Sequence, residues 1–351
     1  MKMRFAFCLL VFALMTFAAL PLETKAEKLN EEELFSILIA IEDEMIYDEL
    51  FYGENCLKPN EAGQIMVIMY HGISSEGRNN DLERSAWAFR NDLEKLYERD
   101  YRLIKLEDLI SGNIDIPAGK TPVILTFDDG ERSAFSLVEG EAGLEPSPNC
   151  AVGIINEFCR EFPDFGKAAV FYINAYKEPF YGAGSVEERF NYLIENGFEL
   201  GNHTYSHVNI SKLNKDQIEE ELEKLDSYVN KYLPDYNMQS FCYPYGERPC
   251  DDRLKPYVLN GRGYSYEIAL KAGPTGTAGM PWHIDFDRLN FPRVRGTDYA
   301  KYDLGWYIKY YDNNPHLRYV SDGNRDVISV PESYGDKIDE DKIGGRKLNI
   351  Y

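Results

Sequence analysis

The chain has 351 residues, of which 44% are hydrophobic, and its formal net charge at pH 7 is −21. This length and apolar content are sufficient for the core of one large domain or of two modest ones. An acidic surface repels phosphate backbones, so the charge argues against nucleic acid as a partner. A neutral or cationic polymer is more compatible with it.

The N-terminus has the pattern of a secretory signal. Lys2 and Arg4 precede an almost wholly apolar run from Phe5 to Leu20, and Thr24-Lys25-Ala26 places small residues at the cleavage positions. The apolar run is short for a membrane span. We therefore expect residues 1–26 to be a signal peptide, either cleaved or retained as an N-terminal anchor, and the protein to be secreted or held at the cell surface.

The cysteines beyond this segment do not form a zinc-binding pattern. They are Cys56, Cys150, Cys159, Cys242 and Cys250, and none of them belongs to a CxxC pair. Export permits disulfides, and bridges 150–159 or 242–250 would close short loops. Five cysteines leave at least one thiol unpaired, and the spacing does not decide the connectivity.

Hydrophobic periodicity predicts the first elements of the chain. A Glu-rich segment at 31–51 is expected to be a helix, and the apolar "QIMVIMYHGIS" at 64–74 is expected to be a strand that carries a histidine. Residues 86–100 have apolar side chains at helical spacing. A turn then leads into the strand "PVILTF" at 122–127.

Strands and helices continue to alternate in the second half. Residues 131–166 resemble an insertion with a short helix, and helices are predicted at 185–196 and 215–233, the latter with a capping box of Asn214 and Gln217. Further strands, each followed by a turn or loop, are predicted within 167–174, 197–207, 238–246, 263–270 and 288–294. This alternation predicts a parallel α/β architecture, in which sites are built at the C-terminal ends of the strands.

Two adjacent acids and a glycine, Asp128-Asp129-Gly130, end the strand at 122–127. Neighbouring side chains on a strand normally point to opposite faces. A strand end that turns on a glycine relaxes this rule and lets both carboxylates reach one site. The alternative is an ordinary turn, because Asp and Gly are common turn residues.

Two histidines four residues apart follow another predicted strand, in "GNHTYSH". On one helical turn or in a tight loop, His203 and His207 can both reach one cation. Such a pair alone is a weak signal, because histidines at this spacing are usually surface residues. A carboxylate added to them gives a His₂-Asp set, which leaves coordination positions open, as in catalytic metal sites.

The motifs "TFDDG", "HTYSH" and "YPYG", in this order and at these separations, resemble the polysaccharide deacetylase family, the NodB-type carbohydrate esterases. The similarity covers roughly residues 61–300. It implies a distorted (β/α) barrel and metal-dependent removal of acetyl groups from sugars. We expect a catalytic domain at 61–300, preceded by an N-terminal helical segment at 27–60 and followed by a polar C-terminal extension at 301–351.

The resemblance also implies roles for individual residues. Asp129, His203 and His207 are expected to bind a divalent metal, Zn²⁺ or alternatively Co²⁺ or Ni²⁺. Asp128 is expected to take a proton from the attacking water. The backbone N–H of Tyr245, the residue after the proline, is expected to stabilise the oxyanion.

The sequence departs from the family pattern at the general acid. The usual late strand with a histidine is missing, but "VIMYH" upstream supplies His71. A circular permutation can move a strand without moving its side chain, and a permuted branch that acts on poly-N-acetylglucosamine resembles this chain. His71 is therefore the predicted acid, with a structural histidine as the alternative reading and His283 as a weaker candidate.

The sequence also departs from the family at an arginine. Many relatives have an arginine at the position that Cys242 occupies here, where it orients the catalytic base. By resemblance to similar sequences, Arg293 in "FPRVRG" replaces it, although an exposed arginine is the alternative. The aromatic residues Tyr172, Tyr245 and Trp282 are candidates to line a sugar-binding groove, with core or ordinary surface positions as the alternative.

The expected function is that of a secreted, metal-dependent hydrolase that removes N-acetyl groups from N-acetylglucosamine-containing polysaccharide. Its predicted partner is therefore an acetylated polysaccharide or oligosaccharide, without nucleic acid and without a stable protein partner. The first alternative is an esterase that removes O-acetyl groups from xylan or another glycan. The second is a glycan-binding pseudoenzyme that has lost turnover.

Overall fold

The computed structural model describes residues 57–274 and 276–351. The predicted signal peptide, the predicted helix at 31–51 and Cys56 lie outside these residues. Within the described part, none of the helices combines the length and the apolarity that crossing a bilayer requires.

Seven parallel strands close into a barrel, as the alternating pattern and the family resemblance predict. Their order around the ring is β1-β14-β13-β10-β9-β8-β5, and β1 pairs with β5 to close it. The strands are β1 (Met66–Tyr70), β5 (Thr121–Phe127), β8 (Val170–Ile173), β9 (Glu199–Asn202), β10 (Ser240–Cys242), β13 (Ile268–Pro274) and β14 (Phe291–Arg295). The circular permutation stays a prediction, because one chain's strand order does not reveal an ancestral order.

Alternation along the strands builds two cores. In β5, Val123 and Leu125 belong to a large cluster that includes the apolar faces of the helices, whereas Ile124 between them belongs to a second cluster. The second cluster also holds inward-facing residues of other barrel strands, such as Val67 and Val170. Both faces of the strands are therefore covered, which explains their nearly continuous apolar sequences.

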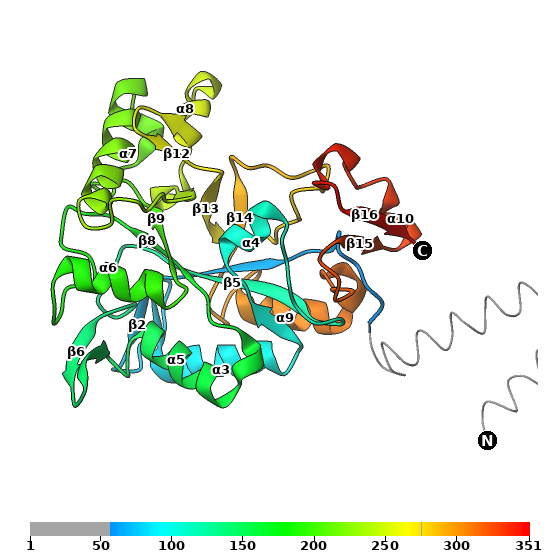
Figure 1. Cartoon of the computed structure of the whole chain (residues 1–351), viewed down its shortest axis with the longest axis horizontal. Helices are drawn as coiled ribbons and strands as arrows, with labels where there is room; N and C mark the ends of the chain where they lie inside the picture. The colour runs from blue at the N-terminus through cyan, green and yellow to red at the C-terminus, as the bar shows by residue number, and fades with distance from the viewer. Residues whose placement is uncertain (1–56, 275) are drawn as a thin grey trace, which may run out of the picture. The chain divides into compact units, whose positions relative to one another are not determined.

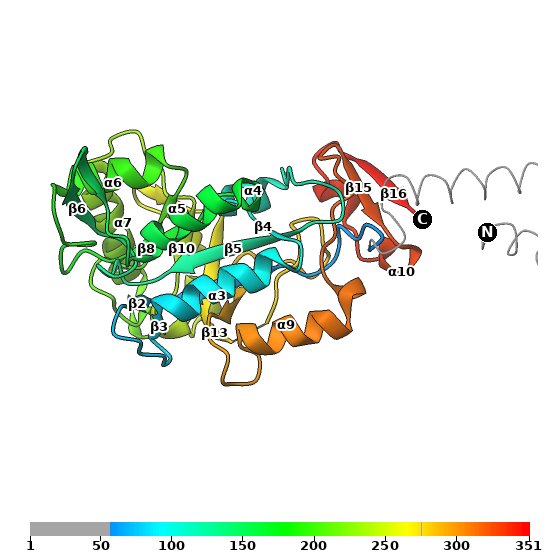
Figure 2. The same ribbon diagram turned by 90° about the horizontal axis from the view of Figure 1, so that it is seen from below.

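Helices flank the barrel strands, and a short one lies in the C-terminal region (Figures 1 and 2). They are α3 (Ala86–Tyr97), α4 (Leu106–Ser111), α5 (Ala151–Glu161), α6 (Val186–Glu195), α7 (Lys215–Asn230), α8 (Pro256–Leu259), α9 (Leu304–Asn313) and α10 (Glu332–Gly335). The predicted capping box of Asn214 and Gln217 is confirmed at the start of α7. In Figures 1 and 2, α3 and α9 run alongside the barrel strands.

Shorter strands decorate this framework. A hairpin of β6 (Leu137–Gly140) and β7 (Gly143–Pro146) precedes α5 inside the predicted insertion. The remaining short strands are β2 (Gly72–Ser74), β3 (Glu83–Ser85), β4 (Tyr101–Leu103), β11 (Asn260–Gly261), β12 (Tyr264–Ser265), β15 (Val327–Val330) and β16 (Lys347–Ile350). The segment expected as a single strand at 263–270 is thus divided between β12 and β13.

The last fifty residues are folded and partly buried. Leu304 and Ile308 of α9 join the large core cluster, and Ile328 and Val330 of β15 join the second. The parallel pair β15–β16 lies with α10 at one end of the described part, drawn in red in Figures 1 and 2. The proposed domain boundaries stay predictions.

The suggested disulfides are absent from the described residues. Cys150, Cys159, Cys242 and Cys250 are all free thiols. Cys150 and Cys242 are buried in the two core clusters, and Cys150 Sγ accepts from the Gly153 N–H at the start of α5. The expectation of a 150–159 or 242–250 bridge is therefore wrong.

Candidate active site

Four barrel strands deliver most of the predicted site residues to one end of the barrel. Asp128 and Asp129 follow β5, and His203 follows β9. His71 directly follows β1, and Arg293 lies within β14. Because all these strands are parallel, their C-terminal ends share one face, which is where barrel sites are built.

Asp128 is held by a two-pronged ion pair with Arg293. The arginine Nη1 donates to Oδ1 at 2.8 Å and its Nη2 donates to Oδ2 at 2.7 Å, and both side chains are almost fully buried. Burial alone would raise the pKa of Asp128, but the guanidinium outweighs it and holds that pKa below its usual range. Asp128 is therefore a charged, oriented carboxylate.

Asp129 faces two imidazoles across short gaps. Its Oδ1 lies 3.5 Å from His203 Nε2 and 3.2 Å from His207 Nε2. One possible ligand atom from each of the three residues lies within 4.8 Å of those of the other two. Asp129 and His207 both have left-handed backbone, with φ of 73° and 54°. Such conformations are strained for residues other than glycine and concentrate at functional sites.

The donor set fits a cation. His203 Nδ1 lies 2.8 Å from the backbone oxygen of Cys242, so this nitrogen must carry the proton and donate. In a neutral ring Nε2 then presents a lone pair to Asp129 Oδ1, an atom that is buried and accepts no hydrogen bond within the described structure. Two lone pairs that face each other repel, and a divalent ion between them removes the conflict.

A proton on His203 Nε2 would also remove the repulsion between this nitrogen and Asp129 Oδ1. Burial lowers the pKa of this histidine, but the acidic groups around it, Cys242 and Asp129 among them, raise it well above the ordinary value. A metal ion that bound here would have to displace that proton, as is general for histidine ligands.

The histidine loop is fixed by α7. Asn202 donates to Asp226 and accepts from the Thr204 N–H at 2.8 Å. The Ser206 N–H donates to Glu221 of the same helix at 2.8 Å. These side-chain contacts orient the loop before any ligand binds, as metal sites require of their supporting residues.

His71 lies beside the Asp128 carboxylate. Its Nε2 is 4.0 Å from Asp128 Oδ2, and burial lowers the pKa of this histidine in spite of the two neighbouring aspartates. The ring is therefore neutral near pH 7, and it would have to receive a proton before it could donate one. Its position satisfies the geometric requirement for an acid near the reacting atoms, whereas its role stays a prediction.

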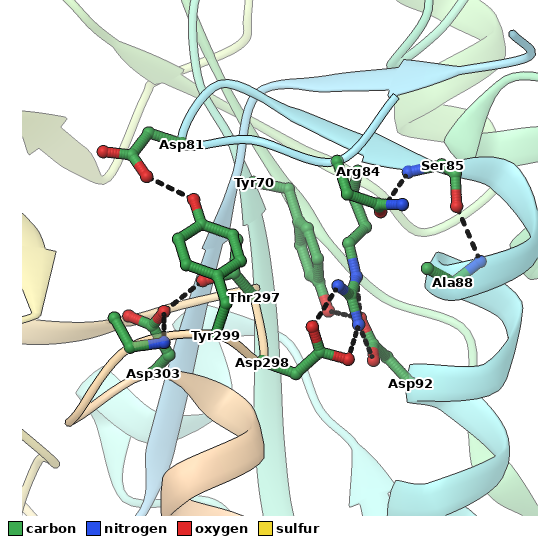
Figure 3. Close-up of polar contacts among 12 residues, drawn as sticks. Tyr70, Asp81, Arg84, Ser85, Ala88, Asp92, Thr297, Asp298, Tyr299 and Asp303 are labelled. Carbon is green, nitrogen blue, oxygen red and sulfur yellow. Dashed lines mark hydrogen bonds and ion pairs between the residues drawn. The ribbon is translucent and has the colours of Figure 1, made fainter. Parts of the chain in front are cut away.

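A buried ionic cluster anchors the strand end that carries His71. Tyr70 donates to Asp92 of α3 at 3.1 Å, and Arg84 binds the same carboxylate through two nitrogens. Arg84 also reaches Asp298 in the loop after β14, at 3.1 and 3.2 Å. Figure 3 shows the guanidinium between the two acids. One arginine thus joins β1, α3 and the β14–α9 loop.

The structure separates the three aromatic candidates for the groove. Tyr172 and Trp282 are buried in the second core cluster, so they cannot contact a sugar, and that expectation is wrong. Tyr245 is 65% exposed and lies edge-on to His207 with ring centroids 4.8 Å apart. Its φ of 60° is left-handed, and the oxyanion role of its N–H stays a prediction.

Two further residues that the sequence singled out, His283 and Cys242, lie in different places. His283 pairs with Ile338 in the C-terminal region and with Asp285, and no contact joins it to the described site residues. Cys242, by contrast, accepts from Arg293 Nη2 at 2.9 Å and lies 3.8 Å from Asp128 Oδ2. In the sequence, Cys242 was identified only as a departure from the family pattern. Its contact with Asp128 and Arg293 depends on the pairing of β10, β13 and β14 in the barrel.

Comparisons with known proteins find similar sequences and similar folds. Residues 115–260 match the family model described as "Polysaccharide deacetylase". The chain is 26% identical over 131 residues to a peptidoglycan-N-acetylglucosamine deacetylase of Bacillus cereus, a match that covers 37% of this chain and 38% of the relative. The chain thus spans well under half the length of that curated relative.

Two solved structures share the fold. The deacetylase PplD of Streptococcus pyogenes, in complex with acetate, superposes with a TM-score of 0.53 at 19% identity, over 72% of this chain and 98% of that one. The polysaccharide deacetylase BC0361 of Bacillus cereus gives 0.51 at 23% identity, over 70% and 68%. At these identities the likeness establishes the barrel fold alone.

Proposed function

We propose, from the premise that this chain carries a polysaccharide deacetylase domain, that it removes N-acetyl groups from N-acetylglucosamine-containing polysaccharide. The observation that carries the proposal is the convergence of Asp129, His203 and His207 on a common point, beside a charged and buried Asp128. This is the donor set of a catalytic metal site together with a separate base.

The metal would be held by these three residues, and when bound it would lower the pKa of a water towards neutrality. The residues of the chain divide the remaining work. Asp128 takes the proton of the attacking water, and Arg293 keeps its carboxylate charged and aimed. His71, whose Nε2 lies 4.0 Å from Asp128 Oδ2, would receive that proton and pass it to the departing amine, and the N–H of Tyr245 would donate to the developing oxyanion.

The finer parts of the proposal rest on separate observations. The named substrate of the Bacillus cereus relative contains N-acetylglucosamine, which supports an N-acetylated glycan here. The signal-like N-terminus supports secretion or retention at the cell surface. Zn²⁺ is proposed as the metal because two imidazoles and one carboxylate suit it, with Co²⁺ and Ni²⁺ as alternatives.

Two other functions remain as competing proposals. An esterase acting on O-acetylated xylan would use the same residues, and a glycan-binding pseudoenzyme would keep the fold without turnover. The intact set of two acids and two histidines supports an active enzyme. Arg293, through its contact with Asp128, supplies the arginine that the family pattern has at the position of Cys242 and that this chain lacks there.

One assay separates the three functions. Purified protein is incubated with Zn²⁺ and with either chito-oligosaccharides or acetylated xylan, and released acetate is measured, with Asp128→Asn as the matched control. Acetate from the chito-oligosaccharides that disappears in the variant supports the proposal. Acetate from xylan alone supports the esterase, and binding of either glycan without any release supports the pseudoenzyme.

A further inference from the structure

Cys242 is a fully buried free thiol among the residues of the proposed chemistry, yet none of the steps uses it. It is the last residue of β10, and the preceding residue, Phe241, pairs with Asn202 of β9. Because the two strands are parallel, the next residue of each, Cys242 and His203, lie side by side at the catalytic end of the barrel. The sequence therefore places a thiol, and no larger side chain, at the centre of the site.

The Arg293 guanidinium has a hydrogen-bond acceptor for each of its five N–H groups. Its Nε donates to the backbone oxygen of Lys271 at 2.9 Å, and each terminal nitrogen uses one hydrogen on the Asp128 carboxylate. The two remaining hydrogens, one on each terminal nitrogen, go to Thr126 Oγ1 at 3.0 Å and to Cys242 Sγ at 2.9 Å. The guanidinium cannot rotate in its plane without breaking one of these bonds, so the paired carboxylate is fixed as well.

The two acceptors that flank the ion pair have different surroundings. Thr126 Oγ1 donates to the Ile68 carbonyl at 3.0 Å, so its lone pairs stay turned towards Arg293. Cys242 Sγ lies 3.8 Å from Asp128 Oδ2 in addition to its contact with Arg293, so it meets both members of the ion pair. The thiol therefore fills the corner between the base and its arginine.

The backbone of Cys242 supports a different residue. Its carbonyl oxygen lies 2.8 Å from His203 Nδ1, which donates to it. This bond sets the tautomer of a candidate metal ligand, as outer hydrogen bonds do in metal sites. A side-chain substitution at Cys242 keeps the carbonyl. The contact of the thiol with the base can therefore be removed while the support of the histidine stays in place.

The thiol also belongs to a second group of possible metal ligands. Ligand atoms of Asp128, His203 and Cys242 lie within 4.8 Å of one another. The Arg293 guanidinium already donates to Asp128 and to Cys242 within this group, and a second positive charge beside it would be repelled. The contacts therefore assign the thiol to the arginine and not to a metal ion.

We propose that Cys242 is a positioning residue for the catalytic base: its sulfur accepts a terminal N–H of Arg293 and so fixes the direction in which the guanidinium presents Asp128. The inference rests on the proposed function and adds to it a residue that acts only through another. Alanine in place of Cys242 would leave a buried N–H without its acceptor, and the arginine would turn to relieve this loss. Such a turn is costly, because a misplacement of about 1 Å can lower a rate about a hundredfold.

Kinetics and metal content test this role together. Cys242→Ala is expected to lower kcat for acetate release from chito-oligosaccharides at least about tenfold, with KM and bound zinc unchanged. Cys242→Ser keeps an acceptor of similar size and is expected to retain kcat within about threefold of the wild-type protein. Cys159→Ala is the matched control, because Cys159 is also a free thiol with a polar contact, to the Gly166 carbonyl, and that contact involves no site residue. Its kcat is expected to equal that of the wild-type protein.

A double-variant cycle separates positioning from a general loss of packing. Lysine in place of Arg293 lacks the N–H that the thiol accepts, so Cys242→Ala in the Arg293→Lys background is expected to lower kcat less than about twofold further. An equal loss in both backgrounds, an unchanged kcat in Cys242→Ala, or a Cys242→Ser variant as slow as Cys242→Ala overturns the positioning role. In each of these cases acetate release by the wild-type protein keeps the deacetylase. No acetate from the wild-type protein overturns the deacetylase and this inference with it.

Discussion

At the scale of single residues, the chemistry depends on how Arg293 holds Asp128. Lysine keeps the charge but cannot form the two parallel hydrogen bonds of the guanidinium. We expect Arg293→Lys to lower kcat for deacetylation by about 100-fold or more while leaving Zn²⁺ affinity nearly unchanged, because Arg293 contacts none of the three metal-binding candidates through a described hydrogen bond. Steady-state kinetics and zinc titration measure the two effects.

Arg293→Ala serves as the second variant and is expected to lower kcat further. Removal of the guanidinium also leaves a buried carboxylate unpaired, which raises the pKa of Asp128 and costs about 3–5 kcal/mol of stability. Intact turnover in the lysine variant would remove Arg293 from the mechanism.

His71 is tested by the choice of leaving group. An amide needs its nitrogen protonated before it departs, whereas an activated aryl ester releases a phenolate without help. We expect His71→Gln to reduce amide hydrolysis by about 10²–10⁴-fold and to affect hydrolysis of an aryl acetate far less, as for loss of a general acid. Parallel assays on both substrates measure this ratio.

An equal loss on both substrates would contradict the acid role and would favour the structural alternative for His71. The wild-type protein and Trp87→Ala, whose side chain is exposed on α3, provide the reference ratio.

The identities of the site residues were predictable because each motif carries its own signal. Paired acids before a glycine and two histidines four apart follow strands, and the structure brings all four side chains together. The fate of the aromatic residues was not predictable in this way. Tyr172 and Trp282 are as apolar as groove residues would be, and only the tertiary packing shows that both are buried in the second core cluster.

At the scale of secondary-structure elements, periodicity located the long helices well. α7 begins at its capping box as predicted, and it ends at Asn230 where the expectation extended to residue 233. The β6–β7 hairpin was missed, because its strands have four residues each and the pattern of exposed and buried positions is weak. The split of β12 from β13 depends on the pairing of β12 with β11, a tertiary contact.

The buried cluster around Arg84 holds several secondary-structure elements together. Arg84 and Asp92 are almost fully buried, so removing the cation leaves a buried carboxylate without its partner. We expect Arg84→Leu to lower the free energy of unfolding by about 3–5 kcal/mol. Denaturant unfolding followed by circular dichroism measures the change.

Arg253→Leu provides the control, because Arg253 pairs with Asp251 on the surface, and it is expected to change the stability little. If Arg84→Leu is as stable as the wild-type protein, then the cluster does not hold β1, α3 and the β14–α9 loop together.

At the scale of the whole molecule, two buried carboxyl groups make stability depend on pH. Burial, aided by Asp322, raises the pKa of Glu61 from 4.5 to about 8, and burial raises the pKa of Glu199 to about 7. The folded state therefore binds more protons than the unfolded chain between about pH 4.5 and 8. Stability from these groups is present below pH 4.5 and is lost as the pH rises to 8.

We expect the free energy of unfolding to fall as the pH rises from 6 to 8, by at most about 1.4 kcal/mol per pH unit for each group. Acid should also destabilise the protein. Arg293 depresses the pKa of Asp128 in the folded state, so at low pH the unfolded chain binds a proton at this carboxyl group more readily than the folded protein does. Urea unfolding at several pH values measures both the loss of stability in acid and the loss between pH 6 and 8. A stability that rises steadily to pH 8 would contradict the protonated state of Glu61 and Glu199.

The sequence predicted the fold class of the barrel but not the strand pairing that closes it. Alternating strands and helices indicated parallel α/β architecture, and the family motifs indicated a barrel. The β1–β5 pairing that closes the ring joins residues 66–70 to 123–127, and nothing local in either strand specifies that partner. The same pairing places His71 beside Asp128, so the predicted acid depends on a tertiary contact.

The most direct test of the account is the metal content of the purified protein and of its ligand variants. After loading with Zn²⁺ and dialysis, mass spectrometry is expected to find one zinc ion per chain in the wild-type protein and in Arg293→Lys. Asp129→Ala and His203→Ala should lose it, because each removes one of the three converging donors. Zinc that is absent from the wild-type protein, or that is retained at one per chain in both ligand variants, would contradict the metal centre on which the proposed chemistry depends.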